Sequence, residues 1–586
     1  MSDLSRRQFF AGAAIIGAGA AGSGLLSACG TSVKKTSGRS GAAAKTLFIA
    51  GFQWGIPTNF NPLSPTSGWP CGENNAQYVY ETLVRFNSLN GKLEAGLSTG
   101  LQESGTTGIV VPLQQKAHFQ DGKPITADDV VFTFELAKRH SELSYATFWD
   151  YVKSITKKDD HTVLVTYDKA RLNPGMVKNY LATTYILPMH IWEGVEKQNS
   201  SLGKYANLTP VGSGPYTLTK HDSQQIGLTR DDKYWGTVLY GSLPKPQEIN
   251  HPIFKSNDDG DLAFQNGDVD ISQQFTPQVW KMWEDKKKPI STWFHEKPYD
   301  VPGSIPMLVV NTTKKGLSNP LVRRALAHGI NYALIAKTAM SSYSVPANSS
   351  VILPTGSEAK YFSKENVATN GWKYDVTEAK RILEQDLHAK KGSDGIYRMP
   401  DGTRLGPYVA QTPTGWTDWQ GALQIVASSA KEIGIDIKTQ FPQAPQVTEA
   451  VQNGDFDLAC WSVAGASPAT PWQRFRDVLD NRGVAPLGKS AFYNYGRFKD
   501  PGVPALLDKV ATTPDDGLKD LYAELDKIFM KNAPMIPLMY RPSEFFEYNE
   551  STWTGFPNAK SPRGGSPQFA GAGNQWLYMI KPVAKS

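Results

Sequence analysis

The sequence predicts an α/β protein built from two or more lobes. With 586 residues, 40% of them hydrophobic, the chain is too long for a single hydrophobic core. Strand and helix signals alternate along most of it. The segment QNGDVDI at 265–271 also recurs as QNGDFDL at 452–458, each time between a helical stretch and an apolar run. We interpret the recurrence as a sign that two lobes share the same α/β construction. The alternative is a chance repetition of a common helix-to-strand turn.

The first thirty residues have the pattern of an export signal. Residues 5–10 read SRRQFF, so Arg6 and Arg7 form a twin-arginine pair, and the uncharged stretch that follows is rich in Ala and Gly. That stretch is too short and too glycine-rich for a good membrane span. Residues 26–30 read LSACG, which resembles a bacterial lipobox with Cys29 as the lipidated residue. We therefore predict a twin-arginine lipoprotein signal peptide at 1–28; an uncleaved N-terminal anchor is the alternative.

Residues 29–44 are rich in Ser, Gly, Ala and Lys, a composition typical of a flexible tether. Lipid chains on Cys29 would hold the protein at a membrane, because each buried methylene contributes about 0.8 kcal/mol. The sequence thus predicts an extracytoplasmic protein that contacts the bacterial cell membrane only through its N-terminal lipid.

Charge and metal-ligand patterns exclude several functions. The formal charge of +6 arises from 61 basic and 55 acidic residues without a long basic run, so a nucleic-acid partner is not expected. The three cysteines, Cys29, Cys71 and Cys460, form no Cys-x-x-Cys pair, and no two of the nine histidines lie within four residues of each other. We therefore predict no metal site and no cofactor.

Local signals place several elements in the mature chain. Residues 47–51 are expected to form the first strand. Thr126 is a good N-cap for a helix whose first turn holds Asp128 and Asp129. Asn319-Pro320 starts another helix, since proline is favoured at the first helical position. A third helix is expected over 417–433, stopped by Gly434 and followed by a strand at 435–439.

Four segments resemble, in the same order, sequences of the family 5 extracellular solute-binding proteins, which serve oligopeptide- and dipeptide-type ABC importers. They are HFQDGKPITADDVVFTFEL at 118–136, PVGSGPYTL at 210–218, DDKYWG at 231–236 and the strand-helix segment 311–337. Asp231 stands where the family usually has Asn. We interpret most of these residues as turns and caps that identify the fold and carry no information about the ligand.

The resemblance implies a periplasmic-binding-protein type II fold: two α/β lobes joined by crossover segments, an extra inserted subdomain, and a ligand cleft between the lobes that closes by hinge motion. Mapped onto this chain, lobe one comprises 45–85, 207–303 and 541–586, the inserted subdomain 86–206, and lobe two 304–540. Cys71 and Cys460 then fall in opposite lobes. A disulfide between them would hold the cleft shut, so we expect two free thiols.

Aromatic side chains in irregular segments are the candidates for ligand contact. The chain has 15 Trp, and aromatic faces offer rigid apolar area at low entropic cost. About half of these tryptophans are expected to be ordinary core or lobe-surface residues. The predicted binding residues are Trp54, Trp69, Trp416, Trp419, Trp461, Trp472, Asn311 and Tyr540.

The resemblance also bears on the ligand. Peptide-binding members typically place an acidic residue just after the strand that corresponds to 457–461, whereas SVAGASPATPW at 462–472 contains no carboxylate. The segments TGWTDWQGALQ at 414–424 and 540–557 look more like the cello-oligosaccharide-binding branch. We therefore predict a monomeric, non-enzymatic binding protein that delivers an oligosaccharide to an ABC permease and its ATPase. The alternative is an oligopeptide ligand. A secreted hydrolase is a remote alternative, although the chain has neither G-x-S-x-G nor H-E-x-x-H.

Overall fold

The computed structural model describes residues 45–584 except 65, 73–76, 106, 543–544 and 563–571. The predicted signal peptide with Arg6 and Arg7, the residue Cys29 and the predicted tether all lie outside the described residues. Within the described ranges, no helix combines the length and the apolar character that a membrane crossing requires. All eight residues predicted for the ligand site lie within the described ranges.

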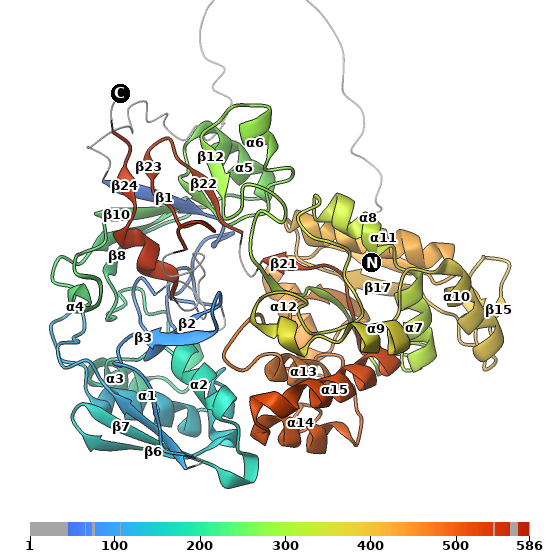
Figure 1. Ribbon diagram of the computed structural model, residues 1–586, viewed down its shortest axis with the longest axis horizontal. Coiled ribbons are helices and arrows are strands. Elements are labelled where there is room, and N and C mark those ends of the chain that lie inside the picture. Colours follow the sequence, from blue (N-terminus) through green and yellow to red (C-terminus); the bar gives the residue numbers. More distant parts are fainter. Residues whose placement is uncertain are drawn as a thin grey trace, which may run out of the picture. The chain divides into compact units, whose positions relative to one another are not determined.

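A seven-stranded mixed sheet forms one α/β unit (Figure 1). In the strand order β12-β22-β11-β1-β10-β9-β8, β1 is parallel to β10 and β11, and the other pairs are antiparallel. Leu47 and Ile49 of β1 are buried, as expected for an inner strand. The strands are β1 (Thr46–Ala50), β8 (Tyr216–His221), β9 (Gln225–Arg230), β10 (Glu248–Pro252), β11 (Ile271–Ser272), β12 (Ile290–Thr292) and β22 (Glu547–Asn549). All seven come from the ranges assigned to lobe one.

Short elements complete this unit. Helix α5 (Asn257–Asn266) leads into β11, and a two-stranded pair near the C-terminal end joins β23 (Trp553–Thr554) to β24 (Lys581–Pro582). The remaining helices are α4 (Thr237–Tyr240), α6 (Lys281–Glu284) and the 3₁₀ helix η8 (Ala572–Tyr578).

A five-stranded sheet forms the second α/β unit, in the order β18-β17-β19-β14-β20. The strand β17 is parallel to β18 and β19, whereas β14 is antiparallel to β19 and β20. The strands are β14 (Met307–Val310), β17 (Tyr408–Gln411), β18 (Ile437–Gln440), β19 (Leu458–Trp461) and β20 (Met535–Pro537). All five come from the range assigned to lobe two.

Helices surround the second sheet. The helix α11 packs on β17 and β18, and α13, α14 and α15 pack on one another (Figure 1). The helices are α7 (Pro320–Gly329), α8 (Tyr332–Leu334), α9 (Lys364–Asn370), α10 (Val376–Arg381), α11 (Thr417–Glu432), α12 (Ala444–Asn453), α13 (Trp472–Leu479), α14 (Val503–Thr512) and α15 (Leu518–Asn532). A small hairpin pairs β15 (Lys390–Lys391) with β16 (Tyr397–Arg398).

A separate four-stranded antiparallel sheet occupies the range assigned to the inserted subdomain. Its order is β4-β5-β7-β6, with α1 packed on β6 and β7. The elements are β4 (Gln102–Glu103), β5 (Gly108–Pro112), β6 (Val152–Asp159), β7 (Thr162–Tyr167), α1 (Ala127–Arg139), α2 (Pro174–Thr183) and α3 (Met189–Gln198). The hairpin β2 (Val84–Asn87) with β3 (Lys92–Ala95) spans the predicted boundary at residue 86.

Two chain segments pass between the large sheets side by side. The strand β13 (Pro302–Ser304) pairs antiparallel with β21 (Arg541–Pro542), directly before β14 and shortly after β20. This two-stranded ribbon lies where the family resemblance sets the limits of lobe two, at residues 304 and 540.

The predicted local signals are found in the structure. Asp129 accepts hydrogen bonds from both the backbone N–H and the hydroxyl of Thr126 at the start of α1. Both QNG segments end a helix with a left-handed glycine, Gly267 (φ +85°) and Gly454 (φ +74°), and lead into β11 and β19. The repeated motif therefore marks the same helix-to-strand turn in each of the two α/β units.

Candidate functional site

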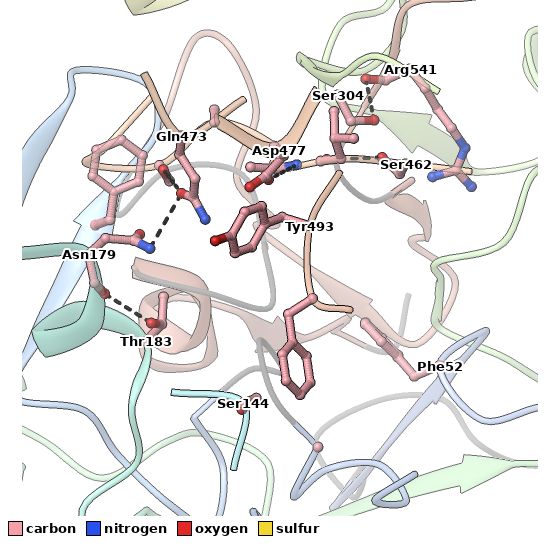
Figure 2. A pocket seen from close by; sticks show the side chains of 18 of the residues that line it. Phe52, Ser144, Asn179, Thr183, Ser304, Ser462, Gln473, Asp477, Tyr493 and Arg541 are labelled. Atoms are coloured by element: carbon pink, nitrogen blue, oxygen red, sulfur yellow. Dashed lines mark hydrogen bonds between the residues drawn. The ribbon is translucent and has the colours of Figure 1, made fainter. Parts of the chain in front are cut away.

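A cavity of about 830 Å³ is lined by residues from all three sheet-containing regions (Figure 2). This volume lies near the upper end of the range for small-molecule sites, which indicates a ligand larger than one amino acid or one sugar ring. The lining includes Phe52, Trp54, Ser144, Asn179, Tyr180, Asn257, Gln274, Phe275, Ser304, Trp416, Asp418, Trp419, Ser462, Gly465, Gln473, Arg476, Asp477, Phe492, Tyr493 and Arg541.

Tryptophans form part of the wall. Trp416 and Trp419 meet edge to face with ring centroids 4.9 Å apart, at the start of α11. The Nε1–H of Trp419 is buried and has no hydrogen-bond partner among the described residues. An unpaired buried donor is costly, so a ligand oxygen that accepts from this indole would relieve the cost.

Two carboxylates line the cavity, and each is paired with an arginine. Asp418 Oδ2 accepts from Arg541 Nε at 2.9 Å, and Asp477 Oδ1 accepts from Arg476 at 2.7 and 2.9 Å. Burial raises the pKa of Asp477, and the neighbouring Arg476 opposes that rise. The segment 462–472 indeed has no carboxylate, yet the fold brings Asp477 and Asp418 to the same cavity. The site therefore holds paired charges of both signs.

The loop after β19 contributes backbone groups to the wall. The N–H of Ala464 donates to Asp477 Oδ2 (3.3 Å), and the carbonyl of Ala464 accepts from Arg474 Nε (2.9 Å). Across the cavity, Asn179 of α2 donates to Gln473 of α13 at 3.4 Å (Figure 2). The insert and the second α/β unit thus touch directly beside the cavity.

Three of the predicted residues, Trp54, Trp416 and Trp419, line the cavity. The other five do not. Trp69 is buried against Tyr78 and His251.

The other four residues, Trp461, Trp472, Asn311 and Tyr540, contact groups within the protein. Trp461 is partly buried and meets Trp419 edge to face, with ring centroids 6.3 Å apart, and the indole of Trp472 donates to the carbonyl of Leu507. The carboxamide of Asn311 donates to the carbonyls of Gly454 and Phe456, and the hydroxyl of Tyr540 accepts from the N–H of Asn348. The polar groups of Trp472, Asn311 and Tyr540 are therefore bonded within the protein, and these three side chains stabilise the structure around the cavity.

Cys71 and Cys460 are free thiols, and both are buried. Burial raises the pKa of each well above the ordinary value of a thiol. Among the described residues, no group of three or more His, Cys, Asp or Glu side chains is placed to hold a metal ion.

Comparisons with known proteins agree on the family. The model for "Bacterial extracellular solute-binding proteins, family 5 Middle" matches residues 93–483, about two thirds of the chain. A probable peptide-binding protein, YejA of Agrobacterium fabrum, is 24% identical over 535 residues, which cover 83% of this chain and 84% of that protein.

Two solved structures share the fold. The periplasmic oligopeptide-binding protein of an oligopeptide ABC transporter from Thermotoga maritima, with mannohexaose bound, is 32% identical, with a TM-score of 0.84 over 92% of this chain and 98% of that one. The oligopeptide-binding protein AppA of Bacillus subtilis, in complex with a nonapeptide, is 20% identical, with a TM-score of 0.74 over 92% of this chain and 99% of that one. This chain therefore belongs to family 5 of the bacterial extracellular solute-binding proteins and has their two-lobed, type II α/β fold.

Proposed function

We propose that this chain is the substrate-binding component of an ABC importer and captures a short oligopeptide in its 830 Å³ cavity. Several relatives carry names that specify peptide binding. These names favour the peptide over the oligosaccharide that the sequence analysis ranked first. The cavity volume supports an oligomeric ligand of either class.

The observation that carries this proposal is the presence of both charge signs in the cavity wall. A peptide brings an ammonium group, a carboxylate and a row of backbone amides. Asp418 engages Arg541 through Oδ2, which leaves its Oδ1 for a ligand ammonium. The guanidinium groups of Arg541 and Arg476 can receive a carboxylate, and the loop at 462–467 lines the same wall.

An oligosaccharide is the second candidate, on one specific observation. The Thermotoga maritima protein, 32% identical to this chain, binds mannohexaose. Trp54, Trp416 and Trp419 supply the aromatic faces that sugar rings stack against, and paired carboxylates give a wall without net charge toward a neutral ligand.

Calorimetry on the folded chain with two ligand panels tests both candidates. The first panel contains tri- to hexapeptides, and the second contains manno- and cello-oligosaccharides of two to six units. We expect peptides to bind with micromolar Kd, about −8 kcal/mol. Acetylation of the N-terminus or amidation of the C-terminus should weaken binding about tenfold, since one charge partner is lost. Binding of oligosaccharides alone would overturn the peptide assignment in favour of the second candidate.

Replacing Trp416 with alanine should lower ligand affinity by about 10- to 100-fold, because a large aromatic face leaves the wall. Calorimetry with the best ligand measures the change. The matched control is Tyr374→Ala, an exposed aromatic residue outside the cavity lining. Equal affinities of the two variants would remove Trp416 from the site.

We also propose that the two predicted lobes close about the β13–β21 ribbon.

We propose further that the monomeric chain is exported through Arg6 and Arg7 and anchored through lipid on Cys29. Full-length protein carrying Cys29→Ala should move from the membrane fraction to the soluble extracytoplasmic fraction. Arg6→Lys together with Arg7→Lys should instead leave the precursor in the cytoplasm. Retention of the Cys29→Ala protein on membranes would contradict the lipid anchor.

A further inference from the structure

A second cavity of about 310 Å³ lies apart from the ligand cavity, and the two share no lining residue. One side is formed by η2 (Lys169–Arg171) and the start of α2 in the inserted subdomain, the other by α14 and Trp472 in lobe two. The ring of Tyr151 meets that of Trp472 edge to face, 6.1 Å between centroids, within this wall. The full lining is Tyr151, Lys169, Ala170, Arg171, Leu172, Asn173, Trp472, Arg482, Asp508, Lys509, Ala511 and Thr512.

Positive charge dominates this cavity. Its lining carries four cationic side chains and a single carboxylate, Asp508. Arg171 pairs with Asp150 (3.0 Å), and Arg482 pairs with Asp480 and Asp508 (both 2.8 Å).

Lys169 of η2 and Lys509 of α14, by contrast, form no ion pair with a carboxylate among the described residues, and they line the cavity from its two sides. Lys509 also offsets the partial negative charge at the carboxyl end of α14. The carboxylates of Asp150, Asp480 and Asp508 offset three of the four cationic side chains, so the site carries one net positive charge.

Asn173 adds a buried donor that lacks a partner. Its Oδ1 accepts from the N–H of Met176 (3.0 Å) and caps α2, which fixes the orientation of the carboxamide. Its Nδ2 is buried without any hydrogen-bond partner in the described residues, and the residue is only 5% exposed. Such a donor costs about 1–3 kcal/mol unless an acceptor reaches it. The start of α2 adds further partial positive charge on the same side.

We propose that this second cavity binds a small, multiply charged oxyanion of the phosphate type. Lys169 and Lys509 supply the charge from opposite sides, and Asn173 Nδ2 donates to one oxygen of the anion. The anion bridges the inserted subdomain and lobe two, so it stabilises the arrangement in which these two regions touch. Because coupling between two sites is reciprocal, the anion raises affinity in the ligand cavity and the ligand raises affinity for the anion.

Calorimetry and thermal shift with inorganic phosphate, at constant ionic strength set by chloride, test the proposal on the folded chain. We expect saturable binding of phosphate and a saturable rise in melting temperature. The double variant Lys169→Ala/Lys509→Ala should bind phosphate at least tenfold more weakly. Asn173→Asp keeps an N-cap oxygen but replaces the donor with negative charge, so it should lose phosphate binding while the helix stays capped. Lys390→Ala, at an exposed lysine in β15, is the matched control.

Three results would overturn the proposal: no saturation with phosphate, an equal response of the double variant and the control, or full phosphate binding by Asn173→Asp. Sedimentation with vesicles that contain an anionic phospholipid distinguishes the source of the phosphate group. Pelleting that depends on Lys169 and Lys509 would replace the free anion with a lipid headgroup.

Discussion

Replacing Arg474 with alanine should destabilise the folded protein by about 3–5 kcal/mol, the usual cost of breaking a buried ion pair from one side. The Arg474 guanidinium is fully buried and binds both oxygens of Glu358, at 2.6 and 2.9 Å. It also donates to the carbonyls of Val351 (2.8 Å) and Ala464 (2.9 Å). Alanine would leave the Glu358 carboxylate buried without its countercharge and both carbonyls without a donor. Urea unfolding followed by tryptophan fluorescence measures the loss.

The same substitution should weaken ligand binding, because Ala464 lies in the cavity wall and Arg474 holds its carbonyl. The matched control is Arg381→Ala, which removes an exposed arginine from its pairs with Glu378 and Asp386 and should change stability little. The double variant Arg474→Met/Glu358→Leu removes both charges and should recover much of the stability lost by Arg474→Ala. The account fails if Arg474→Ala and Arg381→Ala unfold at the same urea concentration.

Helix starts and ends could be predicted from the sequence, because they depend on capping residues close by in the chain. The cap of α1, the proline start of α7 and the glycine ends of α5 and α12 each depend on contacts within a few residues, and each is present. The expected helix at 417–433 matches α11, although the strand after it begins two residues later than predicted. The seven- and five-stranded sheets draw their strands from the ranges that the family resemblance assigned to the two lobes.

The chemistry of the site was harder to predict, since it depends on contacts between distant segments. Arg541 and Asp418 are 123 residues apart and meet because the β21 crossover passes the start of α11. No local pattern marks that pair, and the absence of carboxylates in 462–472 concealed Asp477 five residues further on. Likewise, the sequence does not show whether a tryptophan side chain points into the cavity. Trp416 lines the cavity, whereas the indole of Trp472 donates to the carbonyl of Leu507.

A cluster of buried acids beside the crossover ribbon should make stability depend on pH. The hydroxyl of Thr276 lies between two carboxyl groups, with Asp261 Oδ1 at 2.9 Å and Glu547 Oε2 in closer contact. A hydroxyl has one proton to donate. With both carboxylates ionised, only one could accept from Thr276, so the other must carry a proton and donate to the Thr276 oxygen. Tyr343 of lobe two joins the cluster by donating to the Thr276 carbonyl at 2.7 Å.

The surroundings hold protons on these acids. Burial raises the pKa of Asp261 to about 7, and burial followed by the charge of Asp261 raises the pKa of Glu547 well above its ordinary value. Burial also raises the pKa of the neighbouring Asp300 to about 8, with Arg541 as the opposing cation. In the unfolded chain, ordinary carboxyl groups lose their protons near pH 4. Between pH 4 and pH 8 these acids therefore bind fewer protons in the unfolded state than in the folded state, so their contribution to folding stability falls as pH rises.

We expect this cluster to lower the free energy of unfolding as pH rises through 7–8, by about 1.4 kcal/mol per pH unit for each proton that only the folded state retains. Glu547→Gln should flatten this decline, because its amide donates to Thr276 without titrating. Glu550→Gln is the matched control: it lies just beyond the same strand, accepts from Ser291 at 2.6 Å and should keep the wild-type slope. Urea unfolding at pH 5, 6, 7, 8 and 9 measures all three proteins. Tyr343 connects this cluster to lobe two. An unchanged slope in Glu547→Gln would mean that Glu547 does not hold the shared proton.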